Sequence, residues 1–289
     1  WEDVLMVSSD KAFFEAAKIG FNFIPLAHSW PADLETPLST WLKVGHGNPP
    51  GVLLESVEGG EILGRWSVVA NNPLWTATAR GNRLERKWRN GKTDEYLGNP
   101  FEGLRLWLSA YRTVPLPGLP PIGQLYGMWG YELIRWVEPT VPVHECASED
   151  PPDGIWMLMD SILIVDQVKR QITALAYGDL TAVQTPQIAH KKALKRLQEL
   201  ESLMSQPLSN SRPLSWQAES VDKITTKSNF TQSDFENSVV LAKERISAGD
   251  IFQLVLSQRL EARVSKEPLD LYRSLRMVNP SPYMAFFDF

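Results

Sequence analysis

Alternation of apolar and polar residues predicts short strands through the first two thirds of the chain. Residues 75–80 and 83–88 alternate on either side of Gly81-Asn82. Glycine and asparagine between two alternating runs are typical of tight hairpin turns, so we expect an antiparallel meander here. Further strands are predicted at residues 52–56, 62–70, 161–165 and 172–177, the last two joined as a hairpin.

Helical periodicity marks a second set of elements. Asn99 followed by Pro100 supplies an N-cap and a first helical position, and an apolar stripe follows at helical spacing. Thr231 with Asp234 resembles a capping box, and Gly249 is placed to end the helix that they open. Other helices are predicted to begin after Ser9-Asp10, to cover Ile188 to Met204, and to run from Pro268 to just before Asn279.

These elements predict an α+β fold with largely antiparallel sheets and packed helices, because hairpins interleave with isolated helices instead of alternating regularly with them. Residues 207–229 are rich in serine, threonine and polar residues and have no regular apolar period, so they form the best candidate linker. We therefore predict an N-terminal region at residues 1–206 and the start of a second region at residues 230–289.

Composition excludes several classes of function. The net charge is −5, and the densest basic run, residues 191–196, is followed by acidic residues on the same predicted helix. Neither nucleic acid nor a membrane surface is therefore an expected partner. The glycine-containing stretch at residues 123–130 is not GxGxxG, and the chain has no GxxxxGK[ST] motif, so nucleotide binding has no support.

Cysteine and histidine usage also limits the chemistry. The single cysteine, Cys146, excludes an internal disulfide, and the four histidines are far apart in the sequence, so no metal site is predicted within this chain. No apolar stretch approaches the roughly 20 residues needed to span a bilayer. Together with the absence of a signal-peptide pattern, these features favour a cytoplasmic protein.

Both ends of the sequence suggest an incomplete polypeptide. The chain begins at Trp1, and it stops within the apolar, β-prone run at residues 285–289. With nothing following it, this run would be an unpaired strand at a terminus, which soluble proteins avoid, so we expect the polypeptide to continue.

Two segments carry candidate binding chemistry. Glu55 and Ser56 end an apolar strand, where they could simply begin a turn, and the two prolines of residues 279–282 could simply form a rigid connection. Together, however, a carboxylate, a hydroxyl and the Tyr283-Met284 pair could hold a zwitterionic amino acid. The carboxylate would bind the ammonium group, and the tyrosine and methionine would line an apolar pocket.

A third segment is a long predicted strand, Ile251 to Val264. Alternation places Gln253, Val255, Ser257 and Arg259 on one, mostly polar face, and Phe252, Leu254 and Leu256 on the other. The polar face could line a cavity, because buried amides and guanidinium groups require partners. Periodicity alone favours the simpler interpretation, a sheet with one solvated side.

The three segments together resemble component I of anthranilate synthase, a family of chorismate-using enzymes. The resemblance is carried by LLES at residues 53–56, AGDIFQLVLSQR at residues 248–259 and NPSPYM at residues 279–284, with similar sequence at residues 127–132 and 152–153. It implies an enzyme that converts chorismate and ammonia to anthranilate and pyruvate. It further implies a glutamine amidotransferase subunit that supplies the ammonia, bound Mg²⁺, and feedback inhibition by tryptophan.

The resemblance also implies positions for the binding groups. The tryptophan pocket would use Leu54, Glu55, Ser56, Asn279, Pro282, Tyr283 and Met284. The family's catalytic histidine, its Mg²⁺-binding glutamates and most of its chorismate-binding groups would follow residue 289. No catalytic residue or metal ligand is therefore assigned, and the chain by itself is not expected to turn over chorismate. For the tryptophan pocket to exist, the Glu55-Ser56 strand end and the Pro282–Met284 bend must meet around one cavity.

Gln253 bears on which branch of the family the chain resembles, and it would lie beside the substrate site. In the relatives that add water to chorismate, the aligned position is a lysine that acts as a base. Glutamine cannot hold a proton reversibly, whereas ammonia is already a nucleophile and needs no such base. The resemblance thus favours anthranilate synthase, with aminodeoxychorismate synthase as its sibling alternative. A stand-alone tryptophan-binding module is an alternative from a different class.

Overall fold

The computed structural model describes residues 10–56, 64–116, 118–120, 122–138, 140–142, 151–182, 185–208 and 225–289. The chain divides into two compact units, of which the first contains Trp1–Ser211 together with Leu275–Phe289, and the second contains Arg212–Ser274. Most of the predicted linker, residues 209–224, lies outside the described residues. The last strand of the chain therefore belongs to the same compact unit as the first.

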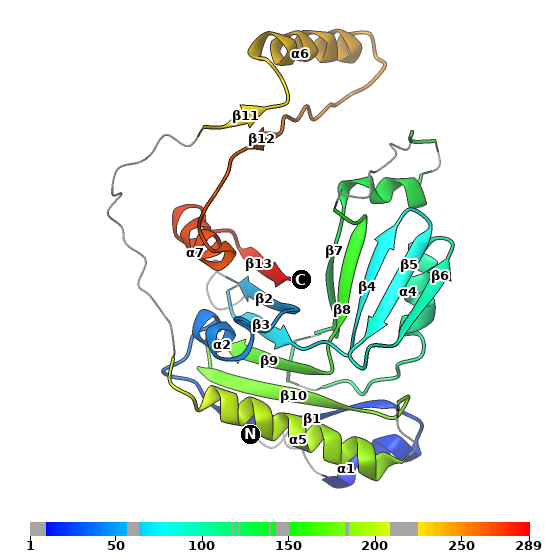
Figure 1. Cartoon of the computed structure of the whole chain (residues 1–289), viewed down its shortest axis with the longest axis vertical. Coiled ribbons are helices and arrows are strands. Elements are labelled where there is room, and N and C mark those ends of the chain that lie inside the picture. Colours follow the sequence, from blue (N-terminus) through cyan, green and yellow to red (C-terminus); the bar gives the residue numbers. More distant parts are fainter. Residues whose placement is uncertain are drawn as a thin grey trace. The chain divides into compact units, whose positions relative to one another are not determined.

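The first unit is built on a six-stranded antiparallel sheet in the order β1-β10-β9-β3-β2-β13 (Figure 1). Its strands are β1 (Phe23–Pro31), β2 (Gly51–Ser56), β3 (Trp66–Asn71), β9 (Ser161–Asp166), β10 (Gln171–Asp179) and β13 (Tyr283–Asp288). Every residue of β9 is buried, because this central strand is covered on both faces. The predicted β9–β10 hairpin is confirmed.

Helices cover one face of this sheet. Helix α5 (Pro186–Met204) lies along β10 and β1, and α1 (Asp10–Lys18) and α2 (Pro37–Val44) pack beside it. Helix α5 buries residues at a spacing of three or four, among them Ala189, Ala193 and Leu197, and this spacing is the apolar stripe from which the helix was predicted.

A second, five-stranded antiparallel sheet has the order β6-β5-β4-β8-β7. Its strands are β4 (Trp75–Arg80), β5 (Arg83–Trp88), β6 (Thr93–Leu97), β7 (Leu125–Trp129) and β8 (Gly154–Leu158). Strand β4 alternates between buried and less buried residues, so Trp75 and its same-face neighbours enter the core as predicted. Gly81 has a φ of 54°, which the tight turn between β4 and β5 requires.

Two apolar cores hold this unit together. One joins the two sheets, since Val52 and Val68 of the first sheet pack with Tyr126 and Met157 of the second. The other lies between the five-stranded sheet and α4 (Pro100–Leu108), whose N-cap Asn99 accepts a hydrogen bond from the backbone of Phe101 as predicted. A short 3₁₀ helix, Tyr131–Trp136, follows β7.

The apolar run at the end of the chain is a correction to the sequence analysis. Residues 283–288 form β13, which pairs with β2 along its whole length and is not an unpaired strand. Its neighbour is the strand whose end, Glu55-Ser56, was predicted to meet the Pro282–Met284 bend, although the two segments lie more than two hundred positions apart in the sequence. The prediction that a helix ends just before Asn279 is confirmed by α7 (Pro268–Val278).

The second unit contains α6 (Gln232–Ser247) and a two-stranded ladder of β11 (Lys227–Ser228) and β12 (Leu260–Glu261). The predicted cap of α6 is present, because the backbone N–H of Asp234 donates to the Thr231 hydroxyl at 3.1 Å. The predicted long strand from Ile251 to Val264 is wrong: only Leu260–Glu261 is a strand. Residues 251–259 pair with no strand of the described chain, and Phe252 is 94% exposed.

All the ladders in the two large sheets are antiparallel, so the predicted α+β class with packed helices is confirmed. The predicted strand at residues 62–70 is present from Trp66, and its first two residues lie outside the described part of the chain. Among the described residues, no helix combines the length and the apolar character that crossing a membrane requires.

Candidate functional site

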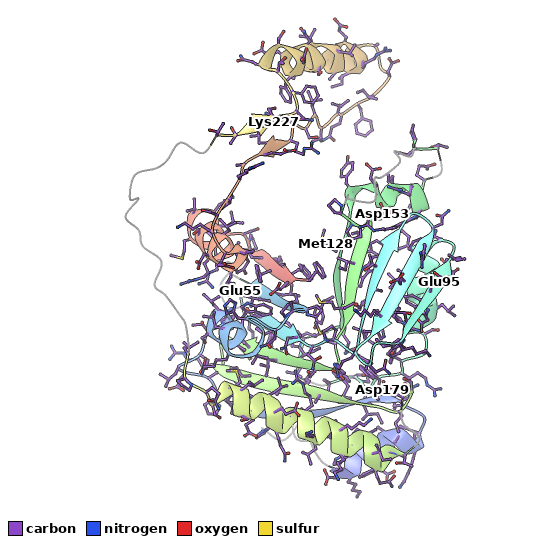
Figure 2. The ribbon with its side chains drawn as sticks, in the orientation of Figure 1. Glu55, Glu95, Met128, Asp153, Asp179 and Lys227 are labelled. Carbon is purple, nitrogen blue, oxygen red and sulfur yellow. The ribbon has the colours of Figure 1, made fainter. Side chains whose placement is uncertain are left out.

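The two segments predicted to meet lie side by side in the six-stranded sheet. Tyr283 is paired with Ser56, Met284 with Glu55, and Ala285 with Leu54, in the antiparallel register of β13 and β2. The two segments that the predicted site requires are therefore adjacent, and their assignment to tryptophan stays a prediction. Figure 2 shows Glu55 at this position.

The side chains of this pair divide between the two faces of the sheet. Successive residues of a strand point to opposite faces, and directly opposed residues share a face. Leu54 packs against the core between the sheets, so Ser56 and Tyr283 lie on that face. Glu55 and Met284 lie on the other face. A ligand that touches both sets must sit at the end of the strand pair, where Ser56 and Tyr283 are terminal residues.

Glu55 is a buried carboxylate with an internal counter-cation. The residue is 4% exposed, although it belongs to an otherwise apolar strand. Arg276, in the last turn of α7, donates from Nη1 to Oε1 of Glu55 at 2.8 Å, and the two side chains are 26% and 3% exposed. Burial of a charge is tolerated when it is paired in this way. The sequence analysis did not identify Arg276.

The backbone around Ser56 is fixed by polar contacts on the side away from β13. The side-chain amide of Gln167 donates to the carbonyl of Ser56 at 3.1 Å and to the hydroxyl of Ser67 at 3.3 Å. The backbone N–H of Ser56 also donates to the Ser67 hydroxyl, at 3.4 Å. Ser67 is 1% exposed. The end of β2 is therefore held by two neighbouring segments, and its side chain remains half-buried.

A second buried ion pair anchors the same end of the sheet. The guanidinium of Arg65 donates to both oxygens of Asp166, with the shortest contact at 2.7 Å. Burial alone would raise the pKa of Asp166, but hydrogen bonds from Arg65 and from the backbone N–H groups of Lys169 and Val168 outweigh it, so the pKa is lowered. This pair joins the start of β3 to the end of β9.

The remaining predicted site residues lie near the strand pair or in the other unit. Asn279 follows α7 directly, and its backbone N–H donates to the carbonyl of Leu275 at 2.9 Å. Pro282 immediately precedes β13. Gln253 belongs to the second unit, where it is exposed and outside regular structure. The assignments of these residues to tryptophan or substrate remain predictions.

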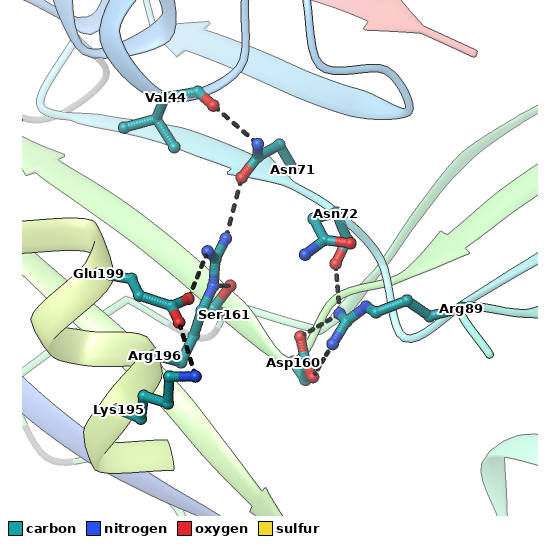
Figure 3. Close-up of polar contacts among 9 residues, drawn as sticks. All are labelled: Val44, Asn71, Asn72, Arg89, Asp160, Ser161, Lys195, Arg196 and Glu199. Carbon is teal, nitrogen blue, oxygen red and sulfur yellow. Dashed lines mark hydrogen bonds and ion pairs between the residues drawn. The ribbon is translucent and has the colours of Figure 1, made fainter. Parts of the chain in front are cut away.

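A polar cavity of about 370 Å³ lies elsewhere in the first unit, between α5, the end of β10 and the connections between the sheets. Arg89 donates to the two oxygens of Asp160 at 2.7 and 2.9 Å and also contacts the carbonyl of Asn72 (Figure 3). Tyr177 lines the cavity, and burial raises its pKa to about 12.

The other arginine that lines this cavity, Arg196, stabilises the packing of neighbouring elements. Arg196 of α5 donates to the hydroxyl of Ser161 at 2.9 Å and to the side-chain oxygen of Asn71 at 3.1 Å. Asn71 in turn donates to the carbonyl of Val44 at 2.7 Å, as Figure 3 shows. These contacts tie α5 to α2 and to two strands. Both cavity arginines are thus engaged by protein acceptors.

The described residues were compared with the ligand sets that hold metal ions. No group of three or more histidine, cysteine, aspartate or glutamate side chains converges among them in a way that could hold an ion. The Mg²⁺ that the resemblance implies stays a prediction, and no step is assigned to it.

Comparison with known proteins places this geometry in a family. Residues 64–289 match the model of the chorismate binding enzyme family. A relative from Synechocystis, named anthranilate synthase component 1, is 48% identical over 96% of the chain, and one from Pseudomonas aeruginosa with the same name is 33% identical over 96%. The chain spans 56% of the length of each of these relatives.

The fold is also that of a solved structure. Anthranilate synthase component I from Streptococcus pneumoniae superimposes with a TM-score of 0.57 and 24% identity, over 87% of this chain and 53% of that protein. The family model covers the strands from β3 to β13, whereas β1 and β2 precede the matched residues. The chain therefore belongs to the chorismate binding enzyme family.

Proposed function

We propose that this chain forms the N-terminal half of component I of anthranilate synthase, the enzyme that begins tryptophan biosynthesis. Relatives with that name are 48% and 33% identical across nearly the whole chain, which spans 56% of their length. The reaction converts chorismate and ammonia to anthranilate, pyruvate and water. Ammonia adds to the chorismate ring, a hydroxyl group leaves, and loss of pyruvate makes the ring aromatic.

Within this enzyme, the first unit carries the regulatory site for tryptophan. The observation that supports this proposal is the direct pairing of Tyr283 with Ser56 and of Met284 with Glu55. A carboxylate, a hydroxyl and two large side chains then surround one strand end, and such groups suit an amino acid with an apolar side chain. Leu54, Asn279 and Pro282 complete the proposed site.

Gln253 supports ammonia, and not water, as the nucleophile. A general base must accept and release a proton near neutral pH, and a carboxamide does neither. Aminodeoxychorismate synthase also uses ammonia and remains the alternative product assignment. We further propose that the ammonia comes from a glutamine amidotransferase subunit, that Mg²⁺ is bound by residues outside this chain, and that the enzyme works in the cytoplasm.

Two measurements test the proposed function. Isothermal titration of the 289-residue chain with L-tryptophan should give saturable binding at one site, without turnover of chorismate. A longer enzyme that contains this chain should produce anthranilate from chorismate and ammonia, detected by its fluorescence. Aminodeoxychorismate as the product would favour the sibling enzyme. Binding of tryptophan without any chorismate turnover by the longer protein would favour a stand-alone regulatory module.

A further inference from the structure

The ion pair between Glu55 and Arg276 raises a question about charge at the proposed regulatory site. Glu55 is the group that would bind the ligand's ammonium, yet its carboxylate already accepts a hydrogen bond from Arg276 at 2.8 Å. The carboxylate side chain is 3% exposed and the guanidinium 26%. An incoming ammonium therefore meets an anion that is already neutralised.

A buried charge is stable only when a nearby charge of opposite sign compensates it. If an amine without a negative charge approached Glu55, two cations would share one carboxylate in a place that water barely reaches, and the excess positive charge would oppose binding. An α-amino acid brings its own anion on the same carbon that bears the ammonium. It can therefore take Glu55 with its ammonium group and offer its carboxylate to the displaced guanidinium.

We propose that Arg276 binds the α-carboxylate of the amino acid while Glu55 binds its ammonium group. The ligand then lies between the two side chains and replaces their direct ion pair. One ion pair is then replaced by two, and the zwitterionic ligand adds no net charge to the site. A planar guanidinium is well suited to a carboxylate, because it can donate two parallel hydrogen bonds. Arg276 keeps more exposure than Glu55, so it is the partner that can move toward an arriving ligand.

This inference rests on the proposed tryptophan site, and it adds a specificity for free amino acids. Met284 shares the face of Glu55, since the two residues are directly opposed in the ladder. The apolar part of the ligand and its charged end can therefore be recognised from neighbouring positions. Amides, esters and simple amines with the same side chain lack the anion that Arg276 requires.

The test compares L-tryptophan with L-tryptophanamide, which keeps the ammonium group and has no carboxylate. Titration calorimetry is done on the 289-residue chain and on Arg276→Met, Arg276→Lys and Arg89→Met. The last variant removes a different partly buried guanidinium from its carboxylate, Asp160, outside the β2–β13 pair. Cooperative thermal unfolding of each variant confirms that it is folded.

We expect the wild-type chain to prefer L-tryptophan to the amide by at least about tenfold. Arg276→Met should weaken L-tryptophan binding by about ten- to hundredfold, the value of a charge-assisted hydrogen bond. It should leave the amide bound at least as well as before, so that the preference collapses. Arg276→Lys should keep part of the preference, and Arg89→Met should keep all of it.

Two results would overturn the inference while leaving the tryptophan site intact. If Arg276→Met weakens both ligands equally, Arg276 only supports the fold around Glu55. If it strengthens both, Arg276 only competes with the ligand's ammonium. If the wild-type chain binds neither ligand, the proposed regulatory site itself is wrong, and the inference fails with it.

Discussion

Met284 is the direct cross-strand partner of Glu55 in the antiparallel pair of β2 and β13. Because β13 is at the edge of the six-stranded sheet, this contact depends on one ladder of backbone hydrogen bonds. A ligand bound at the end of this ladder, as proposed, would touch both an early and a late segment of the chain. Substitutions in either segment should therefore affect the same binding event.

Ser56→Phe should relieve tryptophan inhibition of the longer enzyme without abolishing ammonia-dependent activity. Ser56 is opposite Tyr283, and directly opposed side chains in such ladders lie about 5 Å apart. A phenyl ring at position 56 would fill the space that the ligand needs at the strand end. Anthranilate formation with and without tryptophan measures the effect, and an inhibition constant raised by about tenfold or more is expected. Ser56→Ala adds no bulk and serves as the control.

Asn279→Asp should weaken the same inhibition by a different route. Asn279 follows the last turn of α7, where a negative charge opposes the helix dipole and repels a ligand carboxylate. The substitution preserves size, so catalysis should continue. The inhibition constant in the longer enzyme is compared with that of Asn279→Ala, which is neutral and should retain more inhibition. Unchanged inhibition in both Ser56→Phe and Asn279→Asp would remove these residues from the pocket.

Elements with strong local signals were predictable from the sequence. The helix after Asn99-Pro100 begins where its capping residues place it. Strand β1 was missed because it contains Pro25 and Pro31, and prolines argue against a central strand. It is an edge strand in the structure, where a missing N–H on the outer side costs little. The local sequence does not indicate whether a strand will lie at the edge or in the centre of a sheet.

Contacts between residues far apart in the sequence were the other feature that local sequence patterns could not predict. The carboxylate of Glu55 on an apolar strand signals that a cation must be near, but any of many arginines and lysines could supply it. Arg276 is 221 positions away. The strand predicted at residues 251–264 failed for a related reason, because alternation describes a possible strand and only a neighbouring strand stabilises it. Phe252 and Val255 have no such neighbour and are 94% and 83% exposed.

Arg65→Met should make the first unit more sensitive to acid. The pKa of Asp166 is lowered in the folded chain, so its ionised form stabilises the fold above its unfolded pKa of about 4, and that contribution is lost as the pH falls through the lowered value. Removal of Arg65 should cost about 1.5–3 kcal/mol at neutral pH and move acid unfolding to higher pH. Urea unfolding at neutral pH and acid titration by circular dichroism measure both effects.

The control for this prediction is Arg83→Met. Arg83 pairs with Glu85 and Glu95, but its side chain is 60% exposed, so water replaces the lost contacts. Exposed pairs contribute less than about 1 kcal/mol. Equal effects of the two substitutions would show that burial of the Arg65–Asp166 pair is not the source of its stability.

Tyr177→Phe should reduce the loss of stability at alkaline pH. Burial raises the pKa of Tyr177 to about 12, so its neutral form stabilises the fold fully below the unfolded pKa of about 10. That contribution is lost as the pH rises through the raised value. Unfolding free energies measured between about pH 9 and 11 should fall less steeply in the variant. Its lower stability at neutral pH reflects loss of the Gln124 hydrogen bond at 2.8 Å, and an unchanged slope above pH 10 would contradict the assignment.

Gly127→Ala should destabilise the pairing of β7 with β8. A Cβ atom at Gly127 would lie 2.2 Å from the backbone oxygen of Ile155 and 2.8 Å from Cα of Trp156, closer than atoms approach without a backbone shift. Such overpacking costs about 1–3 kcal/mol. Gly123→Ala is the matched control, because a Cβ there meets no atom within 4 Å and the free energy of unfolding should change by less than about 0.5 kcal/mol. Urea unfolding followed by tryptophan fluorescence compares them, and equal stability of the two variants would mean that β7 yields to the added methyl group without cost.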